Sequence, residues 1–208
     1  MTASGPILGR VVIATGNAGK ARELEALLAG IASSFESLAH HPDLQLPPEG
    51  DASYPENALA KARAVHAALG VAGMGDDSGL EVDALGGAPG IRSARFAGEN
   101  AGDRENNARL LQALREVPSD RRTARFRCAL ALVDPHGREI VVVGTCEGRI
   151  LEAPRGNGGF GYDPLFLPEG ETLTFAELPQ PRKFSISHRG RAATALREVL
   201  FPPGPPPG

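Results

Sequence analysis

The sequence predicts an α/β fold organised as one domain. Short segments rich in Val, Ile and Leu alternate along the chain with segments in which apolar residues recur every three or four positions, a pattern typical of strands followed by amphipathic helices. Gly and Pro account for 26 and 18 of the 208 residues, and they gather between these segments, which favours function on loops. Because the sequence contains no internal repeat and no separating linker, we expect one α/β unit with two lobes and a cleft between them.

The N-terminal part of the chain is expected to contain a strand, a tight turn and a helix. Residues 11–14 are apolar enough for a short buried strand, and residues 15–20 form a Gly-rich turn after it. Leu24 and Leu28 belong to an apolar set with helical spacing, which predicts a helix over residues 21–29 with one buried face.

A second helix is predicted over residues 53–69, and a strand over residues 71–74 follows it. Ser53 and Glu56 have the spacing of a capping box, and the proline between them is tolerated in the first turn of a helix. The strand is expected to end at the acidic turn formed by residues 76–79.

The rest of the chain is predicted to contain a third helix, a β-hairpin and a last helix, joined by Gly-rich loops. These helices are expected over residues 104–116 and 189–200, the hairpin strands over 126–133 and 139–146, and the loops over 85–98 and 155–163. Residues 1–9 are interpreted as a flexible leader and residues 202–208 as a disordered Pro/Gly tail. Residues 10–201 would then form the single domain.

Composition excludes several classes of protein. The formal net charge is −3, the pI is near 6.0 and no basic block is present, which argues against a nucleic-acid partner. No apolar run reaches about 18 residues, and the N-terminus lacks the pattern of a secretory signal, so we expect no membrane association and a cytoplasmic protein. Cys128 and Cys146 are too few for a disulfide scaffold or a zinc site and are interpreted as buried apolar residues.

The turn over residues 15–20 is a candidate phosphate-binding loop. It joins a strand to a helix, and the backbone N–H groups at such a helix start are expected to face outward, where the helix dipole favours an anion. The spacing is not that of a P-loop, because Gly16 and Gly19 lie too close together. The alternative is a helix start whose glycines only ease a tight turn.

Asp76 and Asp77 are candidate metal ligands or proton acceptors. Neighbouring residues of an extended chain face opposite sides, so one of the two is expected to face a reaction centre at the end of the strand. A carboxylate in that position can bind Mg²⁺ or take a proton from water. The alternative is a turn in which an Asp side chain caps backbone N–H groups.

Two further segments carry side chains suited to a nucleotide. Residues 158–164 combine two aromatic rings with glycines and an acid, and such rings can stack on a base, although a loop that packs its rings on the core is an alternative. Hydrogen-bond donors gather just before the last helix at Lys183, Ser185, Ser187, His188 and Arg189. The chain has no G-x-S-x-G elbow, which argues against serine catalysis.

Taken in order, these segments resemble the inosine/xanthosine triphosphate pyrophosphatases, the enzymes that remove non-standard purine nucleotides. The resemblance covers residues 11–200 and is carried by Thr15-Gly16-Asn17-Ala18-Gly19-Lys20, Asp76-Asp77-Ser78-Gly79-Leu80, Leu85-Gly86-Gly87-Ala88-Pro89-Gly90, Gly159-Phe160-Gly161-Tyr162-Asp163-Pro164 and Ser187-His188-Arg189-Gly190. It implies a long mixed central β-sheet flanked by helices and a homodimer. It also implies Mg²⁺-dependent cleavage of ITP, dITP and XTP to the monophosphate and pyrophosphate.

Carried over by position, the resemblance assigns roles to single residues. Asp77 would bind the metal together with Glu49 and accept the proton of the attacking water. Substrate would be bound by Thr15, Gly16, Asn17, Ala18, Gly19, Lys20, Lys61, Ser78 and Arg95 on the phosphate side, and by Phe160, Gly161, Tyr162, Asp163, Lys183, His188 and Arg189 in the nucleotide pocket. The chain has 19 Arg and only three Lys, and all three lysines fall in these matched segments, where a compact ammonium suits phosphate.

The sequence does not decide how the purine base is recognised, and it leaves two alternative functions open. Hypoxanthine and xanthine carry a 6-oxo group where adenine carries an amine, so we hypothesise that donors of His188, Arg189 or nearby backbone N–H groups reach that oxygen. A metal-dependent phosphatase of nucleotides or sugar phosphates also fits the acidic pair, although the D-x-D spacing is absent. A non-catalytic nucleotide sensor is the other alternative. The sequence leaves open whether Asp76 contacts the metal or supports Asp77.

Overall fold

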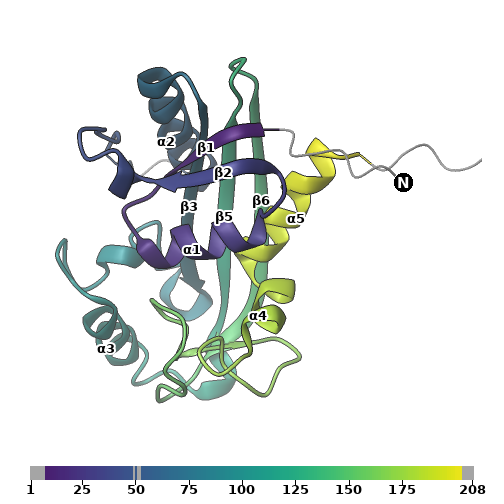
Figure 1. Ribbon diagram of the computed structural model, residues 1–208. Helices are drawn as coiled ribbons and strands as arrows, with labels where there is room; N and C mark the ends of the chain where they lie inside the picture. The colour runs from purple at the N-terminus through teal and green to yellow at the C-terminus, as the bar shows by residue number, and fades with distance from the viewer. Residues whose placement is uncertain (1–7, 49, 51–52, 203–208) are drawn as a thin grey trace, which may run out of the picture. The chain divides into compact units, whose positions relative to one another are not determined.

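The computed structural model describes residues 8–48, 50 and 53–202, and within them the chain forms one seven-stranded sheet flanked by helices (Figure 1). The strands are β1 (Leu8–Ala14), β2 (Ala32–Ser37), β3 (Ala72–Val82), β4 (Pro89–Gly90), β5 (Thr123–Val133), β6 (Glu139–Ile150) and β7 (Phe166–Pro168). The helices are α1 (Ala18–Leu27), α2 (Tyr54–Leu69), α3 (Asp103–Ala113), α4 (Gln180–Ile186) and α5 (His188–Leu200), with short 3-10 turns between them. The predicted α/β class is confirmed.

The sheet is mixed, as the resemblance implies. Its strand order is β2-β1-β3-β5-β6-β7, and β4 pairs with β3 beside this path. β1 runs parallel to both β2 and β3, whereas the pairs β3–β4 and β6–β7 are antiparallel. The register of β1 and β3 sets Ala14 opposite Gly75. Since parallel strands end at the same edge, the turn after β1 lies next to the acidic residues that follow Gly75.

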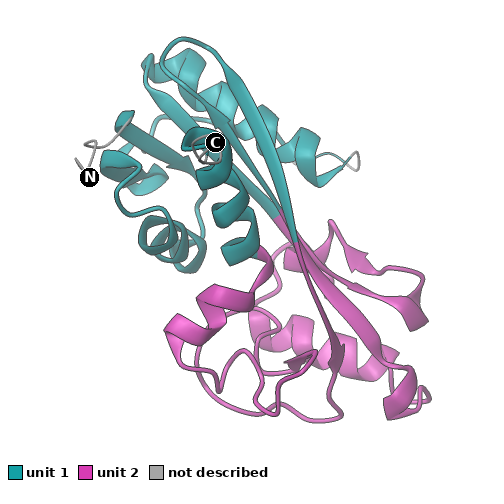
Figure 2. Ribbon diagram, turned by 90° about the vertical axis from the view of Figure 1, so that its right-hand side faces the viewer, with its two compact units in different colours: residues 1–77, 129–144, 189–208 teal, residues 78–128, 145–188 magenta. Residues whose placement is uncertain are grey.

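The chain divides into two compact units, which Figure 2 shows in different colours. Unit 1 contains residues 1–77, 129–144 and 189–208, and unit 2 contains residues 78–128 and 145–188. The boundaries fall inside β3, β5 and β6 and after the first residue of α5. The cleft expected between two lobes stays a prediction, and so do the domain limits. Among the described residues, the search for a helix that is long and apolar enough to cross a bilayer finds none.

In unit 1, α2 lies against β3 in very close contact because β3 carries glycine on that side. A Cβ atom on Gly73 would lie 2.2 Å from the carbonyl oxygen of Ala62, and one on Gly75 would lie 1.9 Å from that of Ala58. Figures 1 and 2 show α1 on one face of the strands and α2 on the other. The two glycines and the two alanines therefore bring the side chains of α2 within reach of the next residues of β3.

Gly75→Ala is expected to lower the free energy of unfolding by about 1–3 kcal/mol, because the added methyl group collides with backbone and α2 must move outward. Urea unfolding measures this change. Gly9→Ala in β1 is the matched control, since no atom lies within 4 Å of a Cβ added there. Equal stability of the two variants would contradict the close approach of α2.

In unit 2, aromatic side chains form the centre of the core. The Phe126 ring lies 4.7 Å from the Phe166 ring and 5.8 Å from the Phe175 ring, measured between centroids. Apolar residues of β3, α3, β5 and β6 surround them, among them Leu80, Leu110 and Ile150, together with Leu165 just before β7. Leu178 and Ile186, the latter in α4, pack against this cluster in the same unit.

Several predicted boundaries differ from the structure. The strand predicted over 71–74 runs on to Val82, so the acidic turn at 76–79 is wrong: these residues lie inside β3, and all of them except Ser78 are buried. The strands β2, β4 and β7 and the helix α4 have no counterpart in the prediction. β1 begins at Leu8, inside the predicted leader, because Leu8 pairs with Ala32 of β2. Residues 1–7 and 203–208 of the predicted leader and tail lie outside the described residues.

Candidate active site

The start of α1 in unit 1 is held by Asn17, the residue just before the helix. Its Oδ1 accepts hydrogen bonds from the backbone N–H groups of Gly19 at 2.8 Å and Lys20 at 3.0 Å, and its own N–H donates to Thr15 Oγ1 at 3.1 Å. Two N–H groups expected to face outward are thus capped by Asn17. Because α1 begins at Ala18, earlier than predicted, Lys20 lies in its first turn and adds its charge to the positive end of the helix.

Asp76 is the centre of a buried network of ion pairs in unit 1. Its Oδ1 lies 2.7 Å from Lys20 Nζ, and its Oδ2 accepts a hydrogen bond from Arg189 Nε at 3.0 Å. Arg189 is only 2% exposed, and its Nη1 also donates to Glu23 Oε2 at 2.6 Å. This network ties α1, β3 and α5 together beside the Gly-rich turn.

The cations of this network set the charge of Asp76. Burial by itself raises the pKa of a carboxyl group, but the charges of Arg189 and Lys20 and their hydrogen bonds outweigh burial and hold the pKa of Asp76 well below its usual value. A carboxylate with so low a pKa is a weak proton acceptor. Asp76 is therefore suited to fixing Lys20, and of the two acids Asp77 is the better candidate for a base.

Asp77 has its partners on α2, on the opposite face of β3. Asn57 Nδ2 donates to Asp77 Oδ2 at 3.0 Å, and Lys61 Nζ lies 3.5 Å from Asp77 Oδ1 and 3.2 Å from the carbonyl oxygen of Asp76. Asp77 is 4% exposed. Since Gly73 and Gly75 also face α2, the alternation along β3 predicted for neighbouring acids agrees with these contacts.

Asn57 was not among the residues that the sequence singled out. It lies one turn before Lys61 on the buried side of α2, and besides Asp77 it bonds both backbone groups of Gly50, donating at 3.1 Å and accepting at 3.2 Å. The spacing of four residues from Lys61 is the signal that could have identified it, because residues four apart share one face of a helix. Glu23, the partner of Arg189, had no comparable signal.

The aromatic loop, defined as residues 156–163 of unit 2, is built around Asp163. Its Oδ2 accepts hydrogen bonds from Lys183 Nζ at 2.7 Å and from the backbone N–H of Phe160 at 3.0 Å. Lys183 Nζ lies 5.3 Å from the centroid of the Phe160 ring. Gly159 has a φ of +71°, and a Cβ there would lie 1.9 Å from Asp163 Oδ2, so only glycine leaves room for this carboxylate.

The two rings of the loop differ in their surroundings. Tyr162 is 4% exposed and donates a hydrogen bond from its hydroxyl to the carbonyl oxygen of Ser93 at 2.8 Å. Burial, with the charge of Asp103, raises the pKa of Tyr162, so its hydroxyl stays protonated. Tyr162 therefore packs in the core, as the alternative interpretation of this loop holds, and the partly exposed Phe160 is left as the candidate for contact with a base.

His188, the last residue of unit 2, stacks on the aromatic core. Its ring lies 4.6 Å from that of Phe126 with an angle of 11° between the planes, and 6.4 Å from that of Phe175. Lys183 Nζ lies 5.6 Å from the Phe175 centroid. Phe175 thus contacts two of the residues that the sequence assigned to the nucleotide pocket, Lys183 and His188.

The predicted site residues fall into two groups. Unit 1 holds residues 15–20, Lys61, Asp77 and Arg189, and unit 2 holds Ser78, Arg95, residues 160–163, Lys183 and His188. Members of the two groups are direct neighbours in the sequence at two places: Asp77 is followed by Ser78, and His188 is followed by Arg189. Arg95 forms an ion pair with Glu99 at 3.7 Å. Glu49 lies outside the described residues.

Comparisons with known proteins agree with the predicted family. The model of the Ham1 family matches residues 11–199. The dITP/XTP pyrophosphatase of Geobacter sulfurreducens is 48% identical over 92% of this chain and 96% of its own, and one from Thermus thermophilus is 49% identical over 95% and 94%. The structure of a HAM1 protein from Coxiella burnetii matches with a TM-score of 0.80 and 36% identity, covering 92% of this chain and 98% of its own. The chain belongs to the Ham1 family.

Proposed function

We propose that this protein hydrolyses non-standard purine nucleoside triphosphates, dITP, ITP and XTP, to the nucleoside monophosphate and pyrophosphate. The observation that carries the proposal is Asp77, a buried carboxylate fixed by Asn57 and Lys61 one residue after a carboxylate that holds Lys20. The names of the relatives, dITP/XTP pyrophosphatases at 48% identity and above, supply the substrate class.

Asp77 is proposed as the base for a direct attack by water. The water oxygen forms a bond to the α-phosphorus, the bond from that phosphorus to the oxygen bridging to the β-phosphate breaks, and pyrophosphate leaves with the electron pair. The proton of the water goes to Asp77. Because no covalent intermediate is needed, positioning and charge supply most of the rate enhancement.

The phosphates are proposed to bind at the start of α1 and at Lys61. Lys20 is 18% exposed at its side chain while its ammonium group is fixed by Asp76, so it is oriented before a substrate arrives. Lys61 is bonded to the carbonyl oxygen of Asp76 and lies beside Asp77. A triphosphate that bridges these two lysines would place its charge next to the proposed base.

Mg²⁺ fits the donors of this site. Mg²⁺ in phosphate sites is bound through one or two carboxylates together with substrate phosphates and water. Asp77 supplies one carboxylate. Asn57 links Asp77 to Gly50, the residue after Glu49, which supports Glu49 as the second. When bound, the ion would neutralise phosphate charge and polarise the phosphorus under attack.

The purine base of the substrate is proposed to bind in unit 2, where His188 donates a hydrogen bond to its 6-oxo group. Arg189 is engaged by Asp76 and Glu23 in unit 1, so among the proposed donors His188 is the better candidate. His188→Ala is expected to lower the ratio of kcat/KM for ITP over ATP by roughly tenfold, because a lost hydrogen bond removes the discrimination. His136→Ala, in an exposed turn, is the control. An unchanged ratio would rule out this role of His188.

One assay separates the three candidate functions. ITP, XTP, dITP, ATP and GTP are incubated with Mg²⁺ or with EDTA, and pyrophosphate and orthophosphate are measured. We expect pyrophosphate as the first product from ITP, XTP and dITP when Mg²⁺ is present and no product with EDTA. In oxygen-18 water, the label is expected to enter the monophosphate. Orthophosphate as first product would instead support a phosphatase, and binding without turnover a nucleotide sensor.

Three further properties belong to the same proposal. The protein is proposed to act in the cytoplasm as a homodimer, with a nucleotide as its ligand and with neither nucleic acid nor membrane as a partner. Light scattering after size-exclusion chromatography measures the oligomeric state, and a mass equal to the monomer mass of 21.7 kDa would contradict the dimer.

A further inference from the structure

The aromatic loop has a backbone that needs external support. Gly156, Gly159 and Gly161 have φ angles of +81°, +71° and +61°, and such residues have wide conformational freedom in the absence of contacts. A hollow of about 480 Å³ also lies between this loop and α3 in unit 2, lined among others by Asp103, Asn107, Leu111, Pro154, Phe160 and Pro164. On that side an open hollow therefore separates part of the loop from α3.

Two polar side chains of α3 reach across the hollow to one residue of the loop. The carboxylate oxygen Oδ2 of Asp103 accepts a hydrogen bond from the N–H of Gly161 at 2.6 Å. Asn107 Nδ2 donates to the carbonyl oxygen of Gly161 at 2.7 Å and to the carbonyl oxygen of Asp103 at the same distance. Both backbone groups of Gly161 are thus bonded to side chains one helical turn apart.

Gly161 lies between the residues that form the proposed base pocket. Phe160 precedes it, with its N–H on Asp163 and its ring near Lys183, and Tyr162 follows it, with its hydroxyl on Ser93. A bond to the N–H of Gly161 fixes the peptide plane shared with Phe160, and a bond to its carbonyl oxygen fixes the plane shared with Tyr162. The two side chains of α3 therefore hold the peptide planes next to the Phe160 ring, in addition to the bonds that Asp163 forms with Phe160.

We propose that Asp103 and Asn107 are positioning residues for base recognition, which act through Gly161 on Phe160. The proposal rests on the function proposed above, in which Phe160 and Lys183 contact the purine. Selectivity between bases needs recognition groups held to within about 0.5 Å, and a loop with four glycines in eight residues does not supply that on its own. A charge-assisted bond at 2.6 Å from Asp103 is a strong restraint for it.

The variants that test the proposal differ in which bond they remove. Asp103→Ala and Asn107→Ala each remove one bond to Gly161, whereas Asp103→Asn keeps an oxygen that can accept from the N–H. The first two are expected to raise KM for ITP and to lower the ITP-over-ATP ratio of kcat/KM, each roughly tenfold, with little change in kcat. Asp103→Asn is expected to keep the KM for ITP and the ITP-over-ATP ratio close to those of the unchanged protein.

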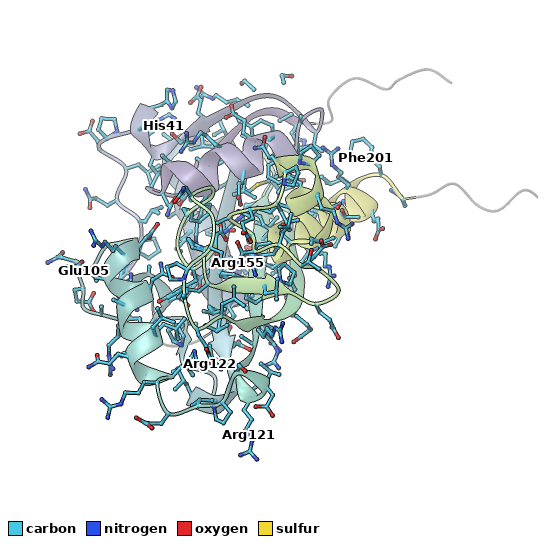
Figure 3. The ribbon with its side chains drawn as sticks, turned by 90° about the horizontal axis from the view of Figure 1, so that it is seen from below. His41, Glu105, Arg121, Arg122, Arg155 and Phe201 are labelled. Carbon is cyan, nitrogen blue, oxygen red and sulfur yellow. The ribbon has the colours of Figure 1, made fainter. Side chains whose placement is uncertain are left out.

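Glu105→Ala is the matched control on α3. Its carboxylate accepts a hydrogen bond from the N–H of Gly102 at 2.7 Å, and its side chain extends outward from the helix (Figure 3). The variant therefore weakens the start of α3 without touching the loop. Normal KM and selectivity are expected for it. If Glu105→Ala reproduced the effect of Asp103→Ala, loss of helix stability would explain both, and the proposal would be overturned.

Hydrogen exchange tests the same bonds without nucleotide. The amide of Gly161 is expected to exchange faster in Asp103→Ala and in Asn107→Ala than in the unchanged protein or in Glu105→Ala. Unaltered exchange, or faster exchange with normal KM and selectivity, would overturn the proposal. If the unchanged protein failed to hydrolyse ITP, the proposed function would fall while the exchange result stood. Calorimetric affinities for ITP and ATP would then decide whether the two residues set selectivity.

Discussion

Asp77→Asn is expected to lose between about a hundredfold and ten-thousandfold in kcat for ITP, the range that a positioned general base contributes. The amide has nearly the same shape as the carboxylate, so its contacts with Asn57 and Lys61 are expected to survive in part, but it takes no proton from water. Steady-state release of pyrophosphate measures the loss. Calorimetric titration with ITP measures whether the nucleotide still binds.

Two companions make this result specific. Asp83→Asn removes an acid that lies in unit 2 and is bonded to Thr123 and Arg125, and it is expected to leave kcat unchanged. Glu49→Gln is expected to raise the Mg²⁺ concentration that gives half the maximal rate, with a smaller loss at saturating Mg²⁺. If saturating Mg²⁺ restored Asp77→Asn to full activity, Asp77 would be a metal ligand alone and some other group would take the proton.

Arg189→Met is expected to lower the free energy of unfolding by about 3–5 kcal/mol, the typical effect of removing one partner from a buried ion pair. The side chain of Arg189 is 2% exposed and that of Asp76 is fully buried, so the Asp76 carboxylate stays shielded from bulk water in the variant, and Glu23 loses its bond to Arg189 as well. Urea unfolding at pH 7 measures the change. Arg63→Met, which breaks the exposed pair with Glu139, should change stability by about 1 kcal/mol or less.

The pH dependence gives this prediction a second test. In the unchanged protein the folded pKa of Asp76 lies below its unfolded value of 3.8, so its contribution to stability is complete above that value and is lost as the pH falls through the folded pKa. In Arg189→Met, burial is expected to outweigh Lys20 and to raise the pKa. The folded variant would then bind a proton more readily than the unfolded chain. The difference in free energy of unfolding between Arg189→Met and the unchanged protein should therefore shrink as the pH is lowered from 7 toward 5. A constant difference would contradict this account.

Local motifs of the candidate site could be predicted from the sequence because their chemistry is contained in a few consecutive residues. The predicted helix cap is present in one half of the capping box: Ser53 Oγ accepts from the N–H of Glu56 at 3.3 Å, and it donates to the Glu56 carboxylate at 2.8 Å. The strand, turn and helix around residues 15–20 also follow from local pattern, although Asn17 caps N–H groups that the pattern leaves open.

Long-range pairing decided what the sequence could not predict. Residues 75–79 are Gly, Asp, Asp, Ser and Gly, which have low strand propensity, and the prediction of a turn there follows from that composition. In the structure β3 lies between β1 and β5, so burial and pairing override propensity. β2 escaped prediction for a related reason, because its polar sequence Ala-Ser-Ser-Phe-Glu-Ser becomes a strand only through its pairing with β1.

Contacts between side chains that are far apart in the sequence could not be predicted either. Arg189 and Asp76 are 113 residues apart, and nothing in either motif indicates that the guanidinium belongs to the carboxylate. The prediction that Arg189 lies in the nucleotide pocket rests on the resemblance alone. Asp103 and Asn107 were hidden among the polar residues of a helix, whose exposed side chains look alike in sequence until the position of the loop beside them is known.

The alternation along β3 has a consequence for how members of the family can diverge. Gly73, Gly75 and Asp77 face α2, while Asp76 faces the opposite side with its own cations. Inserting or deleting one residue between Gly73 and Asp77 would exchange these faces, setting a side chain against the backbone of α2 and moving each carboxylate to the wrong lysine. Length differences between relatives are therefore expected to accumulate in the connecting segments, and gaps in their alignment should be absent from this strand.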